Sequence, residues 1–569
     1  MAPLRSILLL ASQALVLALS SNVHADNGEG QKDCGTEHGS RRKFCAEITR
    51  YAELMRLPGY ALAVAHEGKI VYLHTGGYAN LEQQRPVRAD SIFPIASVTK
   101  TFTAAVMMQY VDEQRIGLDD YLADYPQFAD AFAWPYSSAD IRVRHVLSQT
   151  SEGSKPGAVF TYNGNRFNQV YGVFVKMSGE RDYARAFSGE VQTRILDRLG
   201  LRDTLTQVPE ALDDPHTARL ITPYRYDTTR SAFVSDDDLQ RSHKRAYPNS
   251  GMLSTLSDLA RYVDALDQPG LLSKSSDATM AAAFTLNDGT ASPYALGWFA
   301  ETAGEEPINW VYGLGPSYSS FVLRVTGKRV SLIFLANNDG PTAALRLNYG
   351  NALQFPLVAS FLRTFVKQPI PVIALEAEVP ELQERIVRMS AADRTAAAAR
   401  VTGMALTQQY VEQFYGAPAG RALTLVAMLR RADPGHFRTL QPDLIGLIAA
   451  LADPSLIEAM NDLAAAYSAS GRVDPRTSRD LGDFYDKVGL REESVRHRSV
   501  LVAAPGYETN DATILSAFAL GDQYFVSGDG AAGRKYYWIG IRNAVSAGWG
   551  AGFAEGKRQR MNELSRSRK

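Results

Sequence analysis

The feature that most constrains this chain is a change of pattern at residues 368–371. Before this point, alternating β-branched stretches stand at both ends of a long segment, with helical patterns between them. After it the pattern is helical throughout and rich in Ala, Leu and Arg. A chain of 569 residues is also too long for one hydrophobic core. We therefore expect an α/β domain over residues 45–366, a linker over 367–377 and a helical domain over 378–569.

Two strand pairs and one long helix define the first domain. An alternating stretch from Tyr60 to Tyr78 is broken by Gly68, which predicts a hairpin. Residues 321–325 and 330–335 predict two further strands joined by a short turn. Between these pairs, the apolar positions that follow Ser97 recur at helical spacing and predict a helix with one apolar stripe.

Composition excludes several classes of protein. Hydrophobic residues make up 45% and charged residues 21%, which is ordinary globular usage and argues against a disordered, collagen-like or coiled-coil chain. The formal net charge is −1, so nothing overall predicts a nucleic-acid partner or binding to an anionic membrane. The last 13 residues contain six basic groups, which we interpret as a solvated tail, with contact to a membrane or polyanion as the alternative.

The first 25 residues have the pattern of a signal peptide. Arg5 is followed by an apolar run over residues 7–19, and Val23-His24-Ala25 supplies a cleavage site after Ala25. The alternative is an uncleaved anchor, although the run is short for a spanning helix. No later stretch has about 18 uninterrupted apolar residues, so no transmembrane segment is expected in the mature chain. We expect a periplasmic or secreted protein, with a flexible polar leader over residues 26–44.

Cys34 and Cys45 are the two cysteines of the chain. In an oxidising compartment a local disulfide between them is the simplest interpretation, and two unpaired thiols are the alternative. Two cysteines do not complete a four-ligand zinc site, so no metal is expected.

A possible nucleophile lies at the start of the predicted long helix. Ser97 and Lys100 form an S-x-x-K motif, and residues three apart share one face of a helix. A serine needs a neighbouring base, and burial near a helix N-terminus would lower the lysine pKa enough to supply one. The backbone N–H of Ser97 could also hold an oxyanion. The motif alone is weak, because Ser40 and Lys43 repeat it in the charged leader.

The residues around Ser97 resemble those of a known family. Residues 93–102, which read FPIASVTKTF, are similar to the serine β-lactamase and penicillin-binding family, in particular its class C, D-alanyl carboxypeptidase and esterase branch. Four further stretches fit the same branch in order over about residues 45–350: RIGLDD at 115–120, IRVRHVLSQTS at 141–151, SGMLST at 250–255 and YALGW at 294–298. The resemblance implies a β-lactamase/transpeptidase-like α/β (α+β) fold, an antiparallel sheet flanked by a helical subdomain.

The resemblance also implies which residues form the second motif of the site, Y-x-N. Tyr162 matches its tyrosine and would act as a phenolate-like proton relay beside Lys100, with a packed structural tyrosine as the alternative. The asparagine of the motif falls on Gly164, and the flanking Asn163 or Asn165 could substitute in binding substrate.

The third motif of this branch is a Lys or His, a small residue and a Gly on a strand beside the site. The matching stretch contains neither Lys nor His, which leaves carboxylate recognition without its usual cation. Tyr312, Gly313 and Gly315 are the substrate-binding candidates here, and the glycines would let backbone N–H groups approach the substrate. His145 is interpreted as a hydrogen-bonded structural histidine and not as the base of a triad.

The helical domain contains an internal repeat. The pattern L-G-D-x-Y-x-x-x-G occurs at residues 481–489 in the form LGDFYDKVG and at 520–528 in the form LGDQYFVSG, with a period of 39. It partly resembles a tetratricopeptide helix pair, whose usual period is about 34, and an unrelated helical bundle is the alternative. Such a domain could bind a protein partner.

Together these features predict an exported serine hydrolase that cleaves amide or ester bonds through an acyl-enzyme. Its expected substrates are small molecules or peptides, namely D-amino-acid peptides, esters or β-lactam-like compounds, and no cofactor is required. The alternative is a catalytically weak form of the fold that serves as a binding or scaffold protein through its helical repeats. On that first interpretation a fragment ending near Val366 should fold alone and keep any esterase activity.

Overall fold

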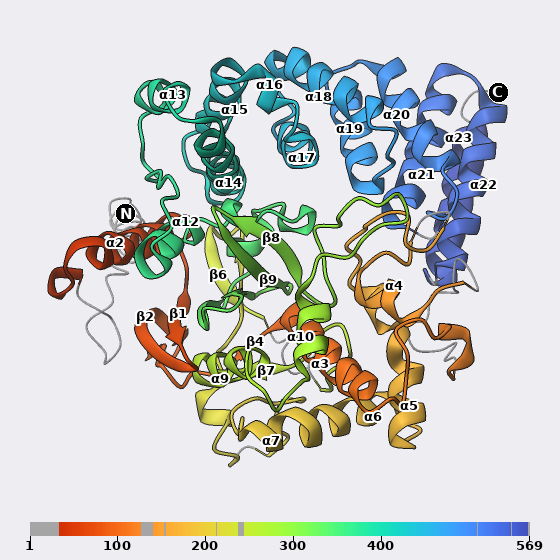
Figure 1. The fold of residues 1–569 in the computed structure, drawn as a ribbon. Coiled ribbons are helices and arrows are strands. Elements are labelled where there is room, and N and C mark those ends of the chain that lie inside the picture. The colour runs from red at the N-terminus through yellow and green to blue at the C-terminus, as the bar shows by residue number, and fades with distance from the viewer. Residues whose placement is uncertain are drawn as a thin grey trace, which may run out of the picture.

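The computed structural model describes residues 34–126, 140–152, 155–211, 213–236, 244–508, 510–547 and 549–566 (Figure 1). The predicted signal peptide and the first residues of the leader lie outside this part of the chain. No helix within it is both long enough and apolar enough to span a bilayer.

A seven-stranded antiparallel sheet forms the centre of the first domain, in the order β3-β2-β1-β11-β10-β9-β8. Its strands are β1 (Gly59–His66), β2 (Lys69–Asn80), β3 (Arg85–Pro86), β8 (Phe299–Ala303), β9 (Glu306–Leu314), β10 (Ser319–Val325) and β11 (Val330–Ala336). Both predicted strand pairs are confirmed. Strand β1 pairs with β11, so the two ends of this domain meet in the middle of the sheet.

Helix α3 (Thr99–Asp112) is the predicted helix after Ser97. The sequence predicted one apolar stripe, but every residue from Thr99 to Tyr110 is buried. The reason is that α3 lies between the sheet and a helical subdomain, so neither side faces solvent. The other helices of this domain are α2 (Gly39–Leu54), α4 (Val143–Leu147), α5 (Tyr171–Ser178), α6 (Tyr183–Val191), α7 (Asp197–Leu199), α9 (Leu256–Leu266), α10 (Lys274–Ala281), α11 (Gly340–Ala343) and α12 (Val358–Phe361).

Two short strand pairs lie outside the large sheet. Strand β4 (Phe93–Pro94) pairs with β7 (Leu253–Ser254), and β5 (Tyr224–Asp227) pairs with β6 (Ala232–Ser235). The first pair joins the segment before Ser97 to the segment before α9. Residues that are far apart in the sequence therefore meet at the start of α3.

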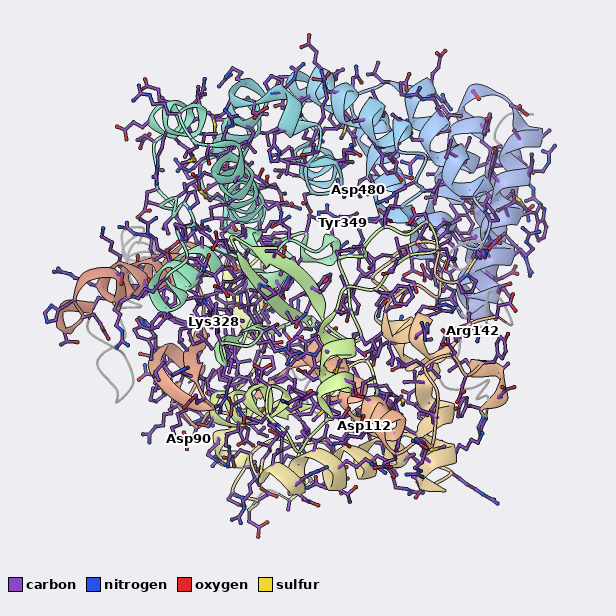
Figure 2. All side chains as sticks on the ribbon, in the orientation of Figure 1. Asp90, Asp112, Arg142, Lys328, Tyr349 and Asp480 are labelled. Atoms are coloured by element: carbon purple, nitrogen blue, oxygen red, sulfur yellow. A yellow bond between two sulfur atoms is a disulfide. The ribbon has the colours of Figure 1, made fainter. Side chains whose placement is uncertain are left out.

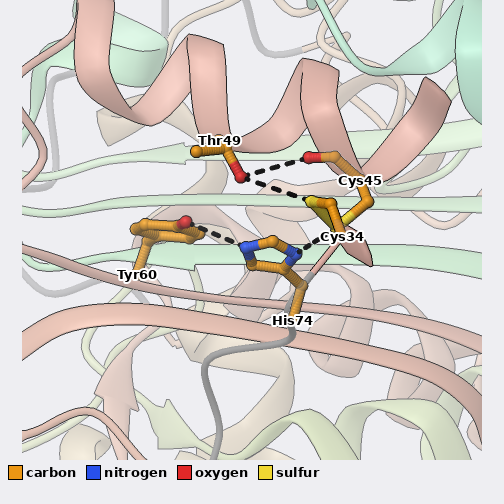
Figure 3. Close-up of a disulfide and its surroundings, with 5 residues drawn as sticks. All are labelled: Cys34, Cys45, Thr49, Tyr60 and His74. Carbon is orange, nitrogen blue, oxygen red and sulfur yellow. Dashed lines mark hydrogen bonds between the residues drawn. A yellow bond between two sulfur atoms is a disulfide. The ribbon is translucent and has the colours of Figure 1, made fainter. Parts of the chain in front are cut away.

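The end of the expected leader is folded, which corrects the prediction of flexibility up to residue 44. Helix α2 begins at Gly39, and Phe44 is fully buried. Cys34 and Cys45 form a disulfide with a Cα–Cα distance of 5.6 Å (Figure 3). The Nδ1 atom of His74 on β2 lies 3.7 Å from the Cys45 sulfur, and its Nε2 atom lies 3.1 Å from the Tyr60 hydroxyl. The bridge therefore lies between α2 and the sheet.

The C-terminal region is all-helical, as predicted. Its helices are α13 (Val379–Val387), α14 (Ala391–Tyr415), α15 (Arg421–Ala432), α16 (Pro434–Phe437), α17 (Gln441–Leu451), α18 (Ile457–Ala469), α19 (Pro475–Lys487), α20 (Arg491–Ala503), α21 (Asp511–Ser527), α22 (Gly530–Ser546) and α23 (Ala551–Arg566). Figure 1 shows them as an arch along the top of the sheet, from α13 and α14 near α12 to α21–α23 beside α4.

Residues 367–377 connect the two regions but do not have the character of the expected linker. Ile370, Ile373 and Leu375 are buried in a core cluster that continues from the sheet into the C-terminal helices. Arg400 on α14, with 0% of its surface exposed, pairs with Glu47 on α2 at 2.7 Å. The physical reason is that α14 packs on residues 352–354, which belong to the same core cluster as the sheet, so the connection runs through a shared core.

Both copies of the sequence repeat fold as helix pairs, α19 with α20 and α21 with α22. A Cβ atom on Gly521 would lie 2.4 Å from the Tyr537 ring of α22, so glycine allows the two helices to approach closely. Gly489 and Gly528 follow the two first helices with positive φ, which ends each helix. The sequence repeat thus corresponds to two copies of one helix hairpin.

Candidate active site

The nucleophile candidate Ser97 lies on a strained turn at the start of α3. The residue before it, Ala96, has φ of +43°, a conformation that non-glycine residues rarely adopt. The turn is held by the Ile95 carbonyl, which accepts hydrogen bonds from Val98 N–H at 3.0 Å and from the Ser320 hydroxyl at 2.8 Å. The Ser97 N–H donates to no other residue of the described chain. It is therefore available to a ligand.

Lys100 lies one helical turn after Ser97 and points at it. Its Nζ atom donates to Ser97 Oγ at 2.8 Å and to the Asn249 carbonyl at 2.8 Å. Only 1% of the lysine surface is exposed, and no carboxylate of the described residues forms an ion pair with it. Burial lowers the pKa of Lys100 from 10.5 to about 7. A neutral amine suited to accept the serine proton is therefore present at neutral pH.

The Asn249 carbonyl is a site group that sequence reasoning missed. Its segment is fixed by a bond from Asn249 N–H to Asn168 Oδ1 at 3.0 Å and by the β4–β7 pairing that follows it. A Cβ atom on Gly164 would lie 3.7 Å from Lys100 Nζ. The position where an asparagine was expected is thus open beside the lysine, and the backbone oxygen of Asn249 supplies the hydrogen bond instead.

Tyr162 lies beside Lys100, with the lysine Nζ 5.5 Å from the centre of its ring. Burial raises the pKa of Tyr162 to about 12, and the nearby Ser97 hydroxyl only partly offsets this. Its hydroxyl has no hydrogen-bond partner of ordinary geometry within the described chain. The phenol is therefore neutral at pH 7, and the role of Tyr162 as a proton relay beside Lys100 stays a prediction.

The two asparagines beside Gly164 differ in their roles. Asn163 Oδ1 accepts from the N–H of Asn165 at 3.0 Å, and its amide nitrogen donates to Glu152 at 2.5 Å. Its side chain is thus occupied in shaping the loop. Asn165 is exposed, and its side chain makes no hydrogen bond with the described residues. Of the two candidates, Asn165 has the amide that is free to meet a substrate.

Strand β9 passes beside the nucleophile through the predicted third motif. A Cβ atom on Gly313 would lie 2.5 Å from the Ile95 carbonyl oxygen and 3.0 Å from Ala96 Cβ, so only glycine fits against the turn. Gly315 donates its N–H to the Tyr318 carbonyl at 3.0 Å within the β9–β10 hairpin. By the alternation of an antiparallel ladder, the N–H of Leu314 then points away from β10. Strand β8 pairs with β9 only as far as Trp310, so this edge of Leu314 is open.

A cavity of about 500 Å³ brings most of these groups together. It is lined by Ser97, Tyr162, Asn163, Asn165, Tyr312 and Leu314 from the first domain. Gly315 is not among its lining residues, and the Cys34–Cys45 bridge belongs to the α2 region. Residues at the starts of α19 and α21 complete the lining, which no sequence signal indicated.

Two further expectations from the sequence concern His145 and metal binding. The His145 Nδ1 atom accepts from the Arg142 N–H at 3.1 Å, and burial lowers the pKa of His145 to about 4, so it is the structural histidine that was expected. No group of three or more His, Cys, Asp or Glu side chains suited to a metal occurs in the described chain.

A serine in hydrogen bond with a buried lysine, at the start of a helix behind an antiparallel sheet, defines the class of the serine β-lactamases and penicillin-binding proteins. The chain belongs to the Beta-lactamase family, whose model matches residues 48–355, more than half of its length. That match ends before α13, so the C-terminal helices lie outside it.

Individual proteins are similar to parts of this chain. Penicillin-binding protein 4* of Bacillus subtilis (strain 168) is 25% identical over 323 residues, which is 49% of this chain and 68% of that protein. A D-aminopeptidase of Brucella anthropi is 28% identical over 284 residues, 44% of this chain and 50% of that protein. A solved structure, the octameric penicillin-binding protein homologue from Pyrococcus abyssi, has 18% identity and a TM-score of 0.47 over 61% of this chain and 81% of that one.

Proposed function

We propose that this protein is an exported serine hydrolase that cleaves amide or ester bonds through an acyl-enzyme on Ser97. The observation that most supports the proposal is the 2.8 Å hydrogen bond between Lys100 Nζ and Ser97 Oγ, made by a buried lysine whose pKa lies at about 7. Burial of an amine without a carboxylate partner destabilises the fold below about pH 10.5, and a role as base beside a nucleophile explains its presence.

The steps follow from the geometry. Neutral Lys100 takes the proton of Ser97 as Oγ attacks the substrate carbonyl, and the Ser97 N–H and the Leu314 N–H stabilise the oxyanion. Tyr162, as a neutral phenol beside the lysine, donates a proton to the leaving group and recovers one from Lys100. Water then attacks the ester formed on Ser97, the acid leaves and the serine regains its proton. No metal or cofactor enters these steps.

Candidate substrates are D-amino-acid peptides, small esters and β-lactam-like compounds. Relatives named as a penicillin-binding protein and a D-aminopeptidase support the first and last of these. The absence of Lys and His from the third motif favours ester or amide substrates over β-lactams. Export is supported by the pattern of the first 25 residues and by the Cys34–Cys45 bridge, since structural disulfides persist in oxidising compartments.

Covalent labelling tests the proposal. The purified protein is incubated separately with a fluorescent fluorophosphonate and a fluorescent penicillin, together with Ser97→Ala and the matched control Ser40→Ala. We expect the fluorophosphonate to label the wild type and the control but not Ser97→Ala. Labelling by both probes would identify a penicillin-reactive enzyme, and labelling by the fluorophosphonate alone an esterase. Labelling by neither would contradict the proposal and favour a binding or scaffold role.

A further inference from the structure

The C-terminal helices form one wall of the Ser97 cavity. Asp474, Pro475, Arg476 and Arg479, at the start of α19, line the same cavity of about 500 Å³ as Ser97 and Tyr162. A second cavity of about 450 Å³ also contains Arg476, and shares Tyr312 and Leu314 with the first. In Figure 2, Asp480 on α19 and Tyr349 of the first domain are labelled beside each other, on the side of α19 that faces the sheet. Groups of the helical region are thus placed to meet a substrate held at Ser97.

Arg476 stands out among the three arginines that line the cavity, which are Arg346, Arg476 and Arg479. Arg346 pairs with Asp480 at 3.4 Å and donates to the Gly446 carbonyl, and Arg479 lies 3.6 Å from Asp480. Arg476 makes no hydrogen bond or ion pair with any described residue. Its side chain is exposed although protein surrounds it, because it projects into the cavity. Its guanidinium therefore has donors that the protein itself does not satisfy.

The carboxylates nearest to Arg476 are engaged elsewhere. Asp474 Oδ1 accepts from the Thr477 N–H at 2.7 Å as the cap of α19, and from the Tyr349 hydroxyl at 3.2 Å. Asp480 pairs with Arg346. The other near groups are the phenols of Tyr312 and Tyr349, and burial raises the pKa of both well above the usual value, so neither supplies a negative charge. Asp511, at the start of α21, also lines the cavity, but within the described chain neither it nor Asp474 or Asp480 forms an ion pair with Arg476. The guanidinium of Arg476 is therefore available to an anion in the cavity.

We propose that Arg476 binds a carboxylate of the substrate whose carbonyl Ser97 attacks, so that the helical region selects anionic substrates. The inference rests on the proposed function of Ser97. Strand β9 offers no cation beside the nucleophile, whereas a guanidinium on the opposite wall presents the planar pair of N–H groups that a carboxylate accepts. Arg476 is thus a specificity-determining residue contributed by a part of the chain outside the family match.

Two matched ester pairs test this inference and locate the carboxylate. 3-Acetoxybenzoate and its methyl ester differ by one charge on the leaving group, and mono-4-nitrophenyl terephthalate and its methyl ester differ by one charge on the acyl group. We expect wild-type kcat/KM to favour the charged member of one pair. Arg476→Ala should reduce that preference by about tenfold or more, with less than about twofold change for the neutral member.

Two further variants complete the test. Arg476→Lys should keep part of the preference, because it keeps the charge but not the planar pair of donors. Arg472→Ala, which removes a charge from the exposed turn just before α19, should leave the preference unchanged. Equal effects of Arg476→Ala on both members of each pair, or a wild type without preference, would overturn the inference while turnover lost in Ser97→Ala still supports the hydrolase. Turnover that persists in Ser97→Ala would remove both.

Discussion

Lys100 determines how the activity depends on pH. The lysine must be neutral to accept the Ser97 proton, and burial lowers its pKa to about 7. We predict that kcat/KM for a neutral ester increases with pH and levels off above about pH 7, as one group loses a proton. The profile is measured on the wild type with Tyr162→Phe as the control, since the phenol has a pKa of about 12 and should not contribute to this limb.

The lowered pKa of Lys100 also makes the free energy of unfolding depend on pH. The unfolded chain binds a proton at Lys100 up to about pH 10.5, whereas the folded protein has released it above about pH 7. The unfolded state therefore holds more protons between these values, and the free energy of unfolding contributed by this group increases with pH across that window.

A flat pH–rate profile from pH 5 to 9 would contradict the role of Lys100 as the base.

Tyr162 should contribute to rate more than to binding. Tyr162→Phe removes a hydroxyl that interacts with Ser97 and makes no hydrogen bond of ordinary geometry with the described residues, so the fold should lose little. We predict that kcat falls on the order of 10²-fold with a smaller change in KM, as expected for a positioned proton-transfer group. Steady-state kinetics on an ester with a poor leaving group measure this, because such an ester needs the donated proton. Unchanged kcat would leave Tyr162 as a packing residue.

At the scale of elements, the sequence predicted the strands and helices that a local residue pattern determines. The β1–β2 and β10–β11 hairpins follow from alternation and from glycine at the turn, and the helix after Ser97 follows from its spacing. The start of α2 was not predictable, because Ser40, Arg41, Arg42 and Lys43 are polar. The disulfide and the buried side chains from Phe44 onward fix the helix on the sheet. Tertiary contacts decide there, not propensity.

The disulfide should stabilise this element modestly. It closes a loop of sequence separation 11, for which the chain-entropy model gives about 2–3 kcal/mol. We predict that the double variant Cys34→Ser/Cys45→Ser unfolds at lower denaturant by this free energy and keeps its activity, since α2 lies apart from the Ser97 cavity. Thiol titration of the unfolded, unreduced wild type should find no free thiol. Two free thiols per chain would refute the bridge.

At the scale of the whole molecule, the two regions share a core and a site. The buried cluster runs from β1 and β10 into α14 and α17, and a Cβ atom on Gly403 of α14 would lie 2.1 Å from the Gln354 carbonyl oxygen. Asn510, before α21, donates to Glu152, whose other oxygen accepts from Asn163 at the site. The C-terminal helices therefore complete the first domain.

This packing reverses the expectation of a separable fragment. A chain ending at Val366 would expose the buried faces that α14 and α17 cover, so we predict that it is insoluble, or inactive if it stays in solution. The measurement is soluble yield and esterase activity of this fragment beside the full chain. A soluble fragment with full activity would show that the helices are a separate domain after all.

The sequence predicted those site residues that lie close together along the chain. Ser97 and Lys100 are three residues apart on one helix, so their meeting follows from helix geometry. The Asn249 carbonyl could not be predicted, because a backbone oxygen has no signature in the sequence. Arg476 could not be placed either, since only the folded arch brings α19 over the Ser97 cavity.

The central claim is that Ser97 becomes acylated, and intact-mass analysis during turnover of a slow ester tests it most directly. We predict one added acyl group per wild-type chain, located by peptide mapping on the peptide that contains Ser97. Ser97→Ala should gain no mass and lose turnover, and Lys100→Ala should lose nearly as much, because residues of one catalytic unit are strongly non-additive. An acyl group on another residue, or wild-type turnover by Ser97→Ala, would contradict the account.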